Sequence, residues 1–299
     1  MSRVIVTGAA GYIGGQTVLN LLDQGHSVMG IDNTMAPQHL IDCGVKWYIG
    51  NFADELELNA IKTFKPDAII HCAGTSLVGP SMLDPRTYYD NNFVKTMSMV
   101  NYLVTNKLTN IRVIFSSSAA TYGNPVITPV QEIDPKEPIS PYGQSKLMID
   151  WMLTSYRRAY GLDFVSFRYF NACGADSKAR HGQAPGASHL IARILEAVKC
   201  NESFTLNGTD YNTPDGTCIR DYIHVVDLAD AHIAAVERLL YNKQNQNYEL
   251  YNLGTGEGVS VKQAIDTFEA STGVKANHEF GPRRDGDVEQ IWADCTKAN

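Results

Sequence analysis

The chain contains 299 residues, of which 44% are hydrophobic and 19% are charged. This length can bury a large core, in one big domain or in two closely packed ones. With 25 basic against 32 acidic residues the formal net charge is −7. That balance argues against nucleic acid or an anionic membrane as a general partner, but it leaves room for a local basic pocket.

The cysteines indicate the compartment. Their spacing contains no CxxC pair and no metal-like cluster, so we expect reduced thiols in the cytoplasm and no bound metal. The six positions are Cys43, Cys72, Cys173, Cys200, Cys218 and Cys295. No signal peptide is visible and no apolar run reaches the length of a membrane span, so no membrane association is expected.

A glycine-rich turn follows the first predicted strand. Residues 4–7 form a short β-branched run, GAAGYIG comes directly after it, and a helix is predicted over about 15–24. Gly8, Gly11 and Gly14 would let the backbone approach a pyrophosphate, which the N–H groups and positive dipole end of the helix also favour. The spacing is GxxGxxG rather than the general GxGxxG, but its strand–turn–helix context favours a dinucleotide.

An acidic residue ends the second predicted strand. Residues 27–31 form this strand, and Asp32 follows at its tip, 18 residues beyond Gly14. A carboxylate at this point can accept a hydrogen bond from an adenosine ribose hydroxyl, and it would repel the extra phosphate of NADP. The turn and the acidic residue together predict NAD as the cofactor.

Strand and helix patterns then alternate. Strands are predicted over 46–49, 68–71, 112–116 and 164–168, and helices over 53–64, 85–106 and 142–160. This alternation predicts an α/β fold, a Rossmann-like doubly wound parallel sheet. Ligands of such sheets lie beyond the carboxyl ends of the strands. We expect the following residues to converge there: Gly8, Asp32, Ala73, Gly74, Ser118 and Asn171.

The regular alternation of predicted strands and helices ends at about residue 170. We expect a Rossmann-like domain over 1–170 and a smaller, mixed substrate-binding portion over 171–299, with segments such as about 217–255 returning to the first domain. Helices are predicted over 188–199, from an N-cap at Asp227 to about 241, and from the capping box Ser260-x-x-Gln263 to Gly273. A strand is predicted over 248–253.

The candidate catalytic residues lie in the middle of the chain. Ser116, Ser117 and Ser118 close an apolar strand, and Tyr142 and Lys146 are spaced to share one face of a helix. The phenol has an ordinary pKa near 10, and an adjacent ammonium would lower it, which would make Tyr142 a tuned general acid and base. Ser118 could hold the same substrate oxygen.

Each of these candidate residues also has an ordinary structural interpretation. A Tyr-x-x-x-Lys spacing occurs in many helices, where the phenol merely stacks on the lysine stem. Arg220 and Arg284 could be surface residues. His224 and His232 are interpreted as ordinary polar groups, because a pair of histidines without a third ligand is not a metal site.

Eight motifs in order carry a family resemblance. They are TGAAGYIG at 7–14, YYDNN at 88–92, FSSSAATYG at 115–123, SPYGQSK at 140–146, RYFNACGA at 168–175, DGTCIRDYIHVVDLADAH at 215–232, YNLGTG at 251–256 and PRRDGD at 282–287. On these motifs the chain resembles the extended short-chain dehydrogenase/reductases and, within them, the UDP-glucose (UDP-galactose) 4-epimerases. The resemblance runs over nearly the whole chain.

The resemblance implies a role for each matching position. Tyr142, Lys146 and Ser118 would be catalytic. NAD would be bound by Gly8, Gly11, Tyr12, Ile13, Gly14, Asp32, Asn33, Asn51, Phe52, Cys72, Ala73, Gly74, Asn92, Ser116, Tyr142, Lys146 and Tyr169. The UDP-sugar would be bound by Ser118, Tyr142, Asn171, His189, Leu190, Arg220, Arg284 and Asp287.

The resemblance also implies a reaction. Tyr142 would take the proton from O4 of the sugar while NAD⁺ accepts the C4 hydride, and the 4-keto sugar would turn over and receive the hydride on its other face. This interconverts UDP-glucose and UDP-galactose, so the protein would be an isomerase with retained NAD. The long helices near 85–106 and 141–160 would be the surfaces of a homodimer.

Several positions depart from the family pattern. Asn51 stands where an aspartate accepts from adenine, Ser76 where some members have a lysine, and His189 where some have an asparagine. Ile291 occupies the position that limits sugar size and is intermediate between the residues that exclude and admit N-acetyl sugars. The chain ends at Asn299, before the final helical segment that the resemblance implies.

Three alternatives follow from the sequence. The first is 4-epimerisation of another UDP-sugar, such as a UDP-N-acetylhexosamine, UDP-glucuronate or a UDP-pentose. The second, a 4,6-dehydratase, is disfavoured because residues 119–122 offer no carboxylate beside the serine cluster. The third is a catalytically silent NAD-binding regulator, which would have no need of a tuned base.

Overall fold

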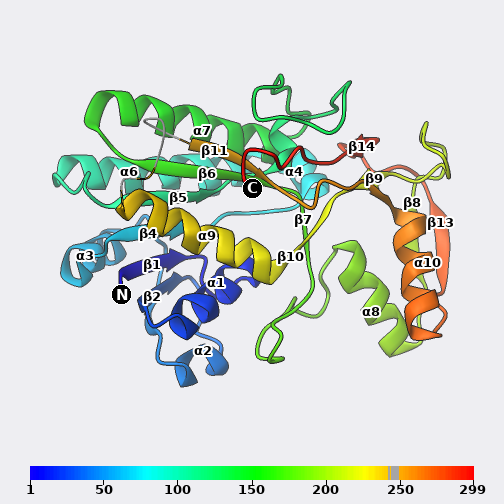
Figure 1. Ribbon diagram of the computed structural model, residues 1–299, viewed down its shortest axis with the longest axis horizontal. Helices are drawn as coiled ribbons and strands as arrows, with labels where there is room; N and C mark the ends of the chain where they lie inside the picture. The colour runs from blue at the N-terminus through cyan, green and yellow to red at the C-terminus, as the bar shows by residue number, and fades with distance from the viewer. Residues whose placement is uncertain (242, 244–248) are drawn as a thin grey trace.

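A seven-stranded, fully parallel sheet forms the centre of the computed structural model, which describes residues 1–241, 243 and 249–299 (Figure 1). The strand order is β11-β6-β5-β4-β1-β2-β3. The strands are β1 (Arg3–Thr7), β2 (Ser27–Asp32), β3 (Lys46–Ile49), β4 (Ala68–His71), β5 (Arg112–Ser116), β6 (Phe164–Tyr169) and β11 (Glu249–Leu253). The predicted doubly wound α/β fold is therefore confirmed.

Helices cover both faces of this sheet because each buried strand turns apolar side chains both ways. On β1, Val4 and Val6 belong to the core under one set of helices, whereas Ile5 belongs to the core on the opposite face. The first face carries α1 (Tyr12–Asp23), α2 (Gln38–Asp42) and α9 (Val225–Leu240). The second carries α3 (Glu55–Phe64), α6 (Lys95–Thr105) and α7 (Pro141–Tyr160).

The helix predicted over 85–106 is a chain of three segments. They are α5 (Pro85–Tyr88), a π-helical segment η1 (Tyr89–Val94) and α6, preceded by a short α4 (Val78–Leu83). A π-helical turn shifts the side-chain register, and such turns occur frequently at functional sites. Here the turn contains Asn92, whose side chain is buried.

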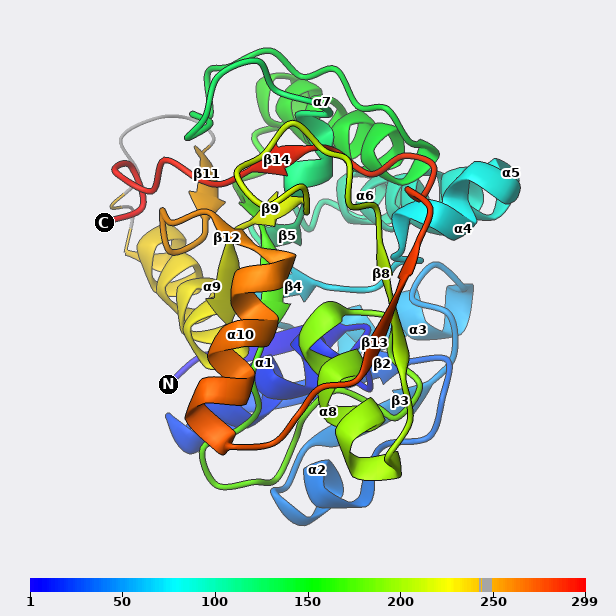
Figure 2. The same ribbon diagram turned by 90° about the vertical axis from the view of Figure 1, so that its right-hand side faces the viewer.

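The rest of the chain builds a smaller lobe beyond one end of the sheet (Figures 1 and 2). Its core packs α8 (Leu190–Cys200) and α10 (Val261–Thr272) against the parallel pair β8 (Phe204–Asn207) and β13 (His278–Gly281). Two small sheets adjoin it: β7 (Asn171–Cys173) with β10 (Tyr222–His224), and β9 (Ile219–Arg220) between β12 (Val259–Ser260) and β14 (Gln290–Ile291). A short 3-10 turn, η2 (Ala119–Thr121), follows the serine cluster.

The C-terminal predictions had mixed outcomes. The capping box is confirmed, because Ser260 Oγ accepts from Gln263 N while Gln263 Oε1 accepts from Ser260 N, and α10 ends at Gly273. The predicted N-cap at Asp227 is wrong. His224 is the N-cap of α9, and its Nδ1 accepts from Val226 N at 3.3 Å, which places Asp227 inside the first turn.

The last strand of the central sheet was predicted from the sequence. The strand predicted over 248–253 is found as β11 over Glu249–Leu253, and residue 248 lies outside the described residues. The six cysteines are free thiols. In the described part of the chain, no helix is both long and apolar enough to cross a bilayer.

Candidate active site

A cleft of about 860 Å³ lies where the glycine turn, the serine cluster and the smaller lobe meet. All eight residues predicted to bind the substrate line it: Ser118, Tyr142, Asn171, His189, Leu190, Arg220, Arg284 and Asp287. Many of the predicted cofactor residues line it too: Gly8, Gly11, Tyr12, Ile13, Gly14, Cys72, Gly74, Tyr142, Lys146 and Tyr169. One continuous cavity thus joins most of the residues that the sequence singled out.

Two glycines of the turn, Gly8 and Gly14, have no room for a side chain. Gly8 has φ of +69°, and a Cβ on Gly14 would lie 2.1 Å from the carbonyl oxygen of Gly8. Gly11 is the N-cap of α1, with no side-chain cap and no acidic residue in the first helical turn. The backbone N–H groups and the positive end of the helix therefore face the cleft without a competing anion from α1.

Seven of the predicted cofactor residues do not line the cleft within the described chain: Asp32, Asn33, Asn51, Phe52, Ala73, Asn92 and Ser116. Two of them shape its wall from behind. Asp32 Oδ2 accepts from Ala10 N at 3.0 Å, and Asn92 Oδ1 accepts from Thr75 N at 2.7 Å. Both Ala10 and Thr75 line the cleft, so these side chains fix the backbone that a ligand would touch.

Tyr142 stands in the first turn of α7, where the N-cap Ser140 accepts from Gly143 N. Its side chain is buried next to Tyr88, with ring centroids 6.3 Å apart. Burial raises the pKa of Tyr142, while a hydrogen bond from Ser118 lowers it in part. The predicted lowering of this pKa by Lys146 is wrong for this structure: desolvation of the ring outweighs the hydrogen bond from Ser118, and Lys146 is not among the groups that shift the pKa.

Lys146 lies one helical turn further along and is also buried. Its Nζ donates to the Ser116 carbonyl oxygen at 2.8 Å and lies 4.9 Å from the Phe115 ring centroid and 6.0 Å from that of Tyr142. Burial lowers the pKa of Lys146 to about 8, although Cys72 and Asp150 act in the opposite direction. The cleft therefore contains a cation whose charge changes near neutral pH.

The smaller lobe supplies the arginines. Arg220 is oriented by its own surroundings, since Nη1 donates to the Ile219 carbonyl at 2.9 Å and Nη2 to that of Val288 at 2.7 Å. Arg284 Nε donates to Asp287 Oδ2 at 3.0 Å. Two guanidinium groups at one cleft can bind the oxygens of a diphosphate.

The N-terminus of α8 also faces the cleft. His189 is the N-cap of this helix, and its Nδ1 is 2.7 Å from Gln183 Nε2. Burial, with a smaller contribution from the charge of Arg284, lowers the pKa of His189. The position that departs from the family pattern therefore holds a neutral imidazole at neutral pH.

The model of the NAD dependent epimerase/dehydratase family matches residues 4–254. The chain belongs to this family. A UDP-glucose 4-epimerase from Halalkalibacterium halodurans is 43% identical over 298 residues, which are 99% of this chain and 88% of that protein.

Two solved structures of UDP-glucose 4-epimerases superpose on this epimerase/dehydratase family member with a TM-score of 0.91. The enzyme from Brucella ovis, in complex with NAD, is 38% identical, and the match covers 100% of this chain and 91% of that chain. The enzyme from Bifidobacterium longum, in complex with NAD⁺ and UDP, is 35% identical, with 99% and 91% covered. The predicted family is confirmed.

The sequence did not predict every residue of the cleft wall. The polar loop at 181–188, Arg193 on α8, strand β8 and Leu77 all line the cavity. The loop carries no chemical motif, and β8 is a four-residue strand whose partner β13 is more than 70 residues away in the chain. A regular spacing of charged residues in α8 could have drawn attention to Arg193, but nothing in the sequence placed it beside the site.

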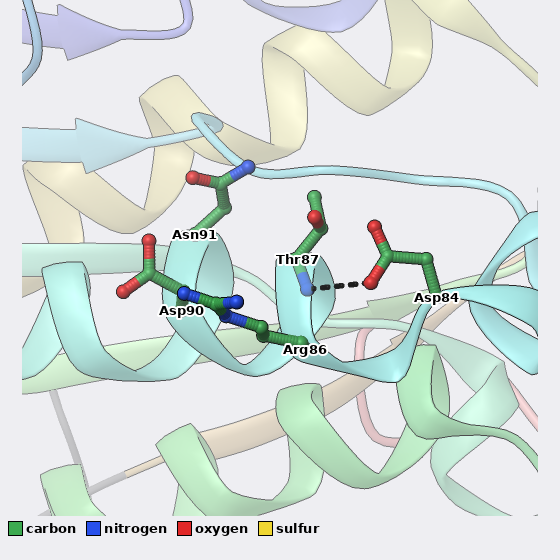
Figure 3. Close-up of a pocket in the computed structure, with 5 residues that line it drawn as sticks. All are labelled: Asp84, Arg86, Thr87, Asp90 and Asn91. Carbon is green, nitrogen blue, oxygen red and sulfur yellow. Dashed lines mark hydrogen bonds between the residues drawn. The ribbon is translucent and has the colours of Figure 1, made fainter.

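A second, smaller pocket lies on the outer surface of the α5–η1 segment (Figure 3). It has a volume of about 420 Å³ and is lined by Asp84, Arg86, Thr87, Asp90 and Asn91, none of which lines the main cleft. Its visible contact, from Thr87 N to Asp84 Oδ1 at 3.3 Å, is the N-cap of α5. None of the residues predicted to be catalytic, or to bind NAD or the UDP-sugar, lines this pocket, so it is separate from the candidate active site.

Proposed function

We propose that this chain is an NAD-dependent 4-epimerase that interconverts UDP-glucose and UDP-galactose. The observation that carries the proposal is the meeting of three groups in one cleft: the glycine turn, the Ser118–Tyr142–Lys146 set and the two arginines of the smaller lobe. The names of the similar proteins support the same reaction.

In this proposal Tyr142 and Ser118 handle the proton at O4 of the sugar. The Ser118 hydroxyl donates to the Tyr142 oxygen, which stabilises the phenolate and holds both oxygens near one substrate hydroxyl. Arg220 and Arg284 bind the diphosphate, which leaves the hexose free to turn over. Lys146 holds a positive charge beside Tyr142 and binds the ribose of the cofactor.

The glycine turn fits NAD, because a Cβ on Gly14 would fill the space between α1 and the Gly8 carbonyl. Gly8, Gly11 and Gly14 would hold its pyrophosphate, and Asp32 its adenosine ribose. When bound, NAD⁺ supplies the hydride acceptor for C4 of the sugar and a positive charge near Tyr142. That charge would lower the pKa of Tyr142, which burial alone raises.

In this proposal the two lobes bind different ligands. We propose that residues 1–170 mainly bind NAD and that residues 171–299 mainly bind the UDP-sugar. Segment α9 and strand β11 return to the main sheet, where α9 packs in its core and β11 pairs with β6. We also propose a homodimer through α7 and the η1–α6 helix, where Trp151 and Val94 are exposed.

The decisive variant is Tyr142→Phe. It keeps the ring in place and removes the acid/base hydroxyl, so NAD and UDP binding should persist while turnover falls by about 10²- to 10⁴-fold. The measurement is incubation with UDP-glucose and UDP-galactose, with C4 stereochemistry read by NMR. Tyr160→Phe, at the exposed end of the same helix, is the matched control and should keep wild-type turnover.

The same assay separates the alternatives. UDP-N-acetylhexosamines, UDP-glucuronate and UDP-pentoses are added as substrates, because Ile291 lines the cleft and can limit the size of the sugar. Preferred turnover of one of these would replace the proposed substrate. Wild-type protein that binds NAD yet epimerises no sugar would overturn the proposal in favour of a silent NAD-binding protein.

A further inference from the structure

Helix α7 carries a buried carboxyl group that the proposed reaction leaves unused. Tyr142, Lys146 and Asp150 follow one another at intervals of four residues, so the three side chains share one face of the helix. All three are buried. Asp150 is not among the described residues that line the cleft, so any influence that it has on the reaction must pass through other residues.

The orientation of Asp150 is set by Arg168 on β6. Nε and Nη2 of this arginine both donate to Asp150 Oδ2, at 3.1 and 3.0 Å, and each side chain is only 2% exposed. The guanidinium is also held at its other end, where Nη1 donates to the Tyr122 hydroxyl and to the Glu132 carbonyl oxygen, each at 3.3 Å. A buried ion pair is weak evidence of stabilisation, because desolvation offsets much of the attraction. These contacts do, however, fix the direction of the carboxyl group.

Two buried serines donate to this carboxyl group. Ser166 Oγ lies 2.6 Å from Asp150 Oδ1, and Ser117 Oγ lies 3.3 Å from Asp150 Oδ2. Carboxylate oxygens accept, so each hydroxyl directs its proton toward Asp150. Ser166 belongs to β6, whereas Ser117 is the middle residue of the serine cluster. Asp150 therefore reaches the active site through Ser117.

The peptide group between Ser116 and Ser117 makes the contact with Lys146. Its carbonyl oxygen accepts from Lys146 Nζ at 2.8 Å, and its N–H donates to the Phe115 carbonyl oxygen at 3.1 Å. Because a peptide group is planar, this carbonyl cannot turn unless the nitrogen and Cα of Ser117 move with it. A Ser117 side chain anchored on Asp150 therefore fixes the direction in which the carbonyl oxygen points.

We propose that Asp150, held by Arg168, is a positioning residue for the epimerase reaction: through Ser117 it fixes the carbonyl oxygen that holds the Lys146 ammonium in the cleft. This inference rests on the proposed function, in which Lys146 binds the ribose of the cofactor beside Tyr142. Without the anchor, the carbonyl oxygen would be free to turn away. The ammonium would then lose both its fixed position and part of the stabilisation of its charge.

The titration of Lys146 can report on this contact. Besides Asp150, the titratable groups of the described chain beside its ammonium are His71, Cys72 and Tyr142. Burial lowers the pKa of His71 to about 3, raises that of Cys72 to about 11 and raises that of Tyr142 above its ordinary value. These three groups are therefore neutral near pH 8, where Lys146 itself titrates.

Two alanine substitutions separate this role from simple packing. Ser117→Ala removes the link from Asp150 to the serine cluster. Ser166→Ala is the matched control, because it removes an equally buried hydroxyl from the same carboxyl group, and Ser166 is not among the described residues that line the cleft. Ser117→Cys keeps a weak S–H donor and is the second variant if Ser117→Ala does not fold.

The first measurement is the pKa of Lys146, read by NMR from its ε-carbon in the NAD-bound full chain labelled at lysine. Lys146→Arg identifies the signal by its absence. A hydrogen bond made by the charged form favours that form, so Ser117→Ala should lower this pKa by about half a unit to one unit. Ser117→Cys should lower it by less, and Ser166→Ala should leave it unchanged.

The second measurement is kcat and KM for the interconversion of the UDP-sugars at neutral pH. We expect Ser117→Ala to lose about tenfold in kcat with KM nearly unchanged, because the sugar contacts stay in place while the ammonium beside Tyr142 is misdirected. Ser166→Ala loses a hydrogen bond to the same carboxyl group, yet its kcat should stay within about threefold of wild type.

Three outcomes would overturn the inference. They are an unchanged Lys146 pKa in both Ser117 variants, an equal fall of this pKa in Ser166→Ala, and a wild-type kcat in Ser117→Ala. If wild-type protein epimerises no sugar, the proposed function fails by itself. The Lys146 titration still decides in that case whether Asp150 positions the ammonium through Ser117.

Discussion

At the residue scale, burial lowers the pKa of Lys146 so far that its charge depends on the pH. The neighbours of Lys146 explain why: the ammonium sits against the Phe115 ring and has a backbone carbonyl as its nearest acceptor. Its pKa is lowered to about 8 from 10.5, so the side chain is charged below pH 8 in the folded protein and loses its proton as the pH rises through that value. In the unfolded chain the proton would be kept until about pH 10.4.

This titration predicts a pH-dependent affinity for NAD. If Lys146 binds the cofactor as a cation, the affinity of the protein freed of NAD should fall as pH rises past about 8. Lys146→Arg keeps its charge, because the guanidinium pKa lies above 12, so its affinity should be lower overall but flat over the same range. Fluorescence titration with NAD from pH 6 to about pH 9.5 checks this, and an equal fall in both proteins would contradict it.

Much of the residue-scale site was predictable because each piece is a local motif. The glycine turn, Asp32 and the Ser118–Tyr142–Lys146 set follow from spacings within a few residues and from strand ends that meet at one edge. The direction of the Tyr142 pKa was not predictable. It depends on how deeply the Tyr142 ring is buried and on the path of the Lys146 side chain. Neither can be read from the spacing of the two residues in the sequence.

At the element scale, the loop over 174–188 is fastened to α1. Arg180 makes a bidentate pair with Asp23, at 2.9 and 2.8 Å, and also donates to Asp176. Next to it, His181 Nε2 lies 2.9 Å from the Tyr12 carbonyl oxygen. Because residues 181–188 form part of the cleft wall, this attachment holds the wall over the glycine turn.

Breaking the attachment should speed the release of NAD. Asp23→Asn weakens the bidentate pair at the far end of α1 without touching the cleft, so we expect NAD to dissociate several-fold faster. The measurement is exchange of bound NAD against labelled NAD. Lys178→Gln is the matched control, because Lys178 also pairs with Asp23 but is mostly exposed, where such pairs contribute little. Equal exchange rates in both variants would contradict the role of the loop.

The elements that sequence reasoning missed are the shortest ones. Strands β9, β12 and β14 have two residues each, too few to show an alternating pattern. They exist because segments from 219, 259 and 290 are brought together by the larger elements around them. The long elements, whose apolar faces repeat over several turns or whole strands, were predicted nearly to their ends.

At the scale of the whole molecule, one face of the main lobe is exposed and partly apolar. Trp151 on α7 is 61% exposed and Val94 on η1 is 42% exposed. The two elements pack against each other, so a second copy could cover both. A large aromatic side chain is the kind of residue that dominates the binding energy of an interface.

Trp151→Glu should therefore dissociate the proposed homodimer, with the dissociation constant raised by about tenfold or more, since a charge would be buried at the interface. Light scattering coupled to gel filtration over a dilution series measures this. Leu195→Glu changes a similarly exposed residue on α8 in the other lobe and should leave the mass unchanged. A wild-type protein that is monomeric at every concentration would exclude the dimer.

The late return of the chain to the first sheet has a consequence for dissection of the molecule. Helix α9 and strand β11 come after most of the smaller lobe in the sequence, yet α9 covers β5 and β6 and β11 pairs with β6. A fragment cut after Phe170 would leave apolar side chains such as Val165 and Phe167 uncovered and the backbone of β6 open to pairing with other molecules. The proposed NAD-binding lobe is therefore not one continuous segment of the chain: its last helix and its last strand follow most of the smaller lobe in the sequence.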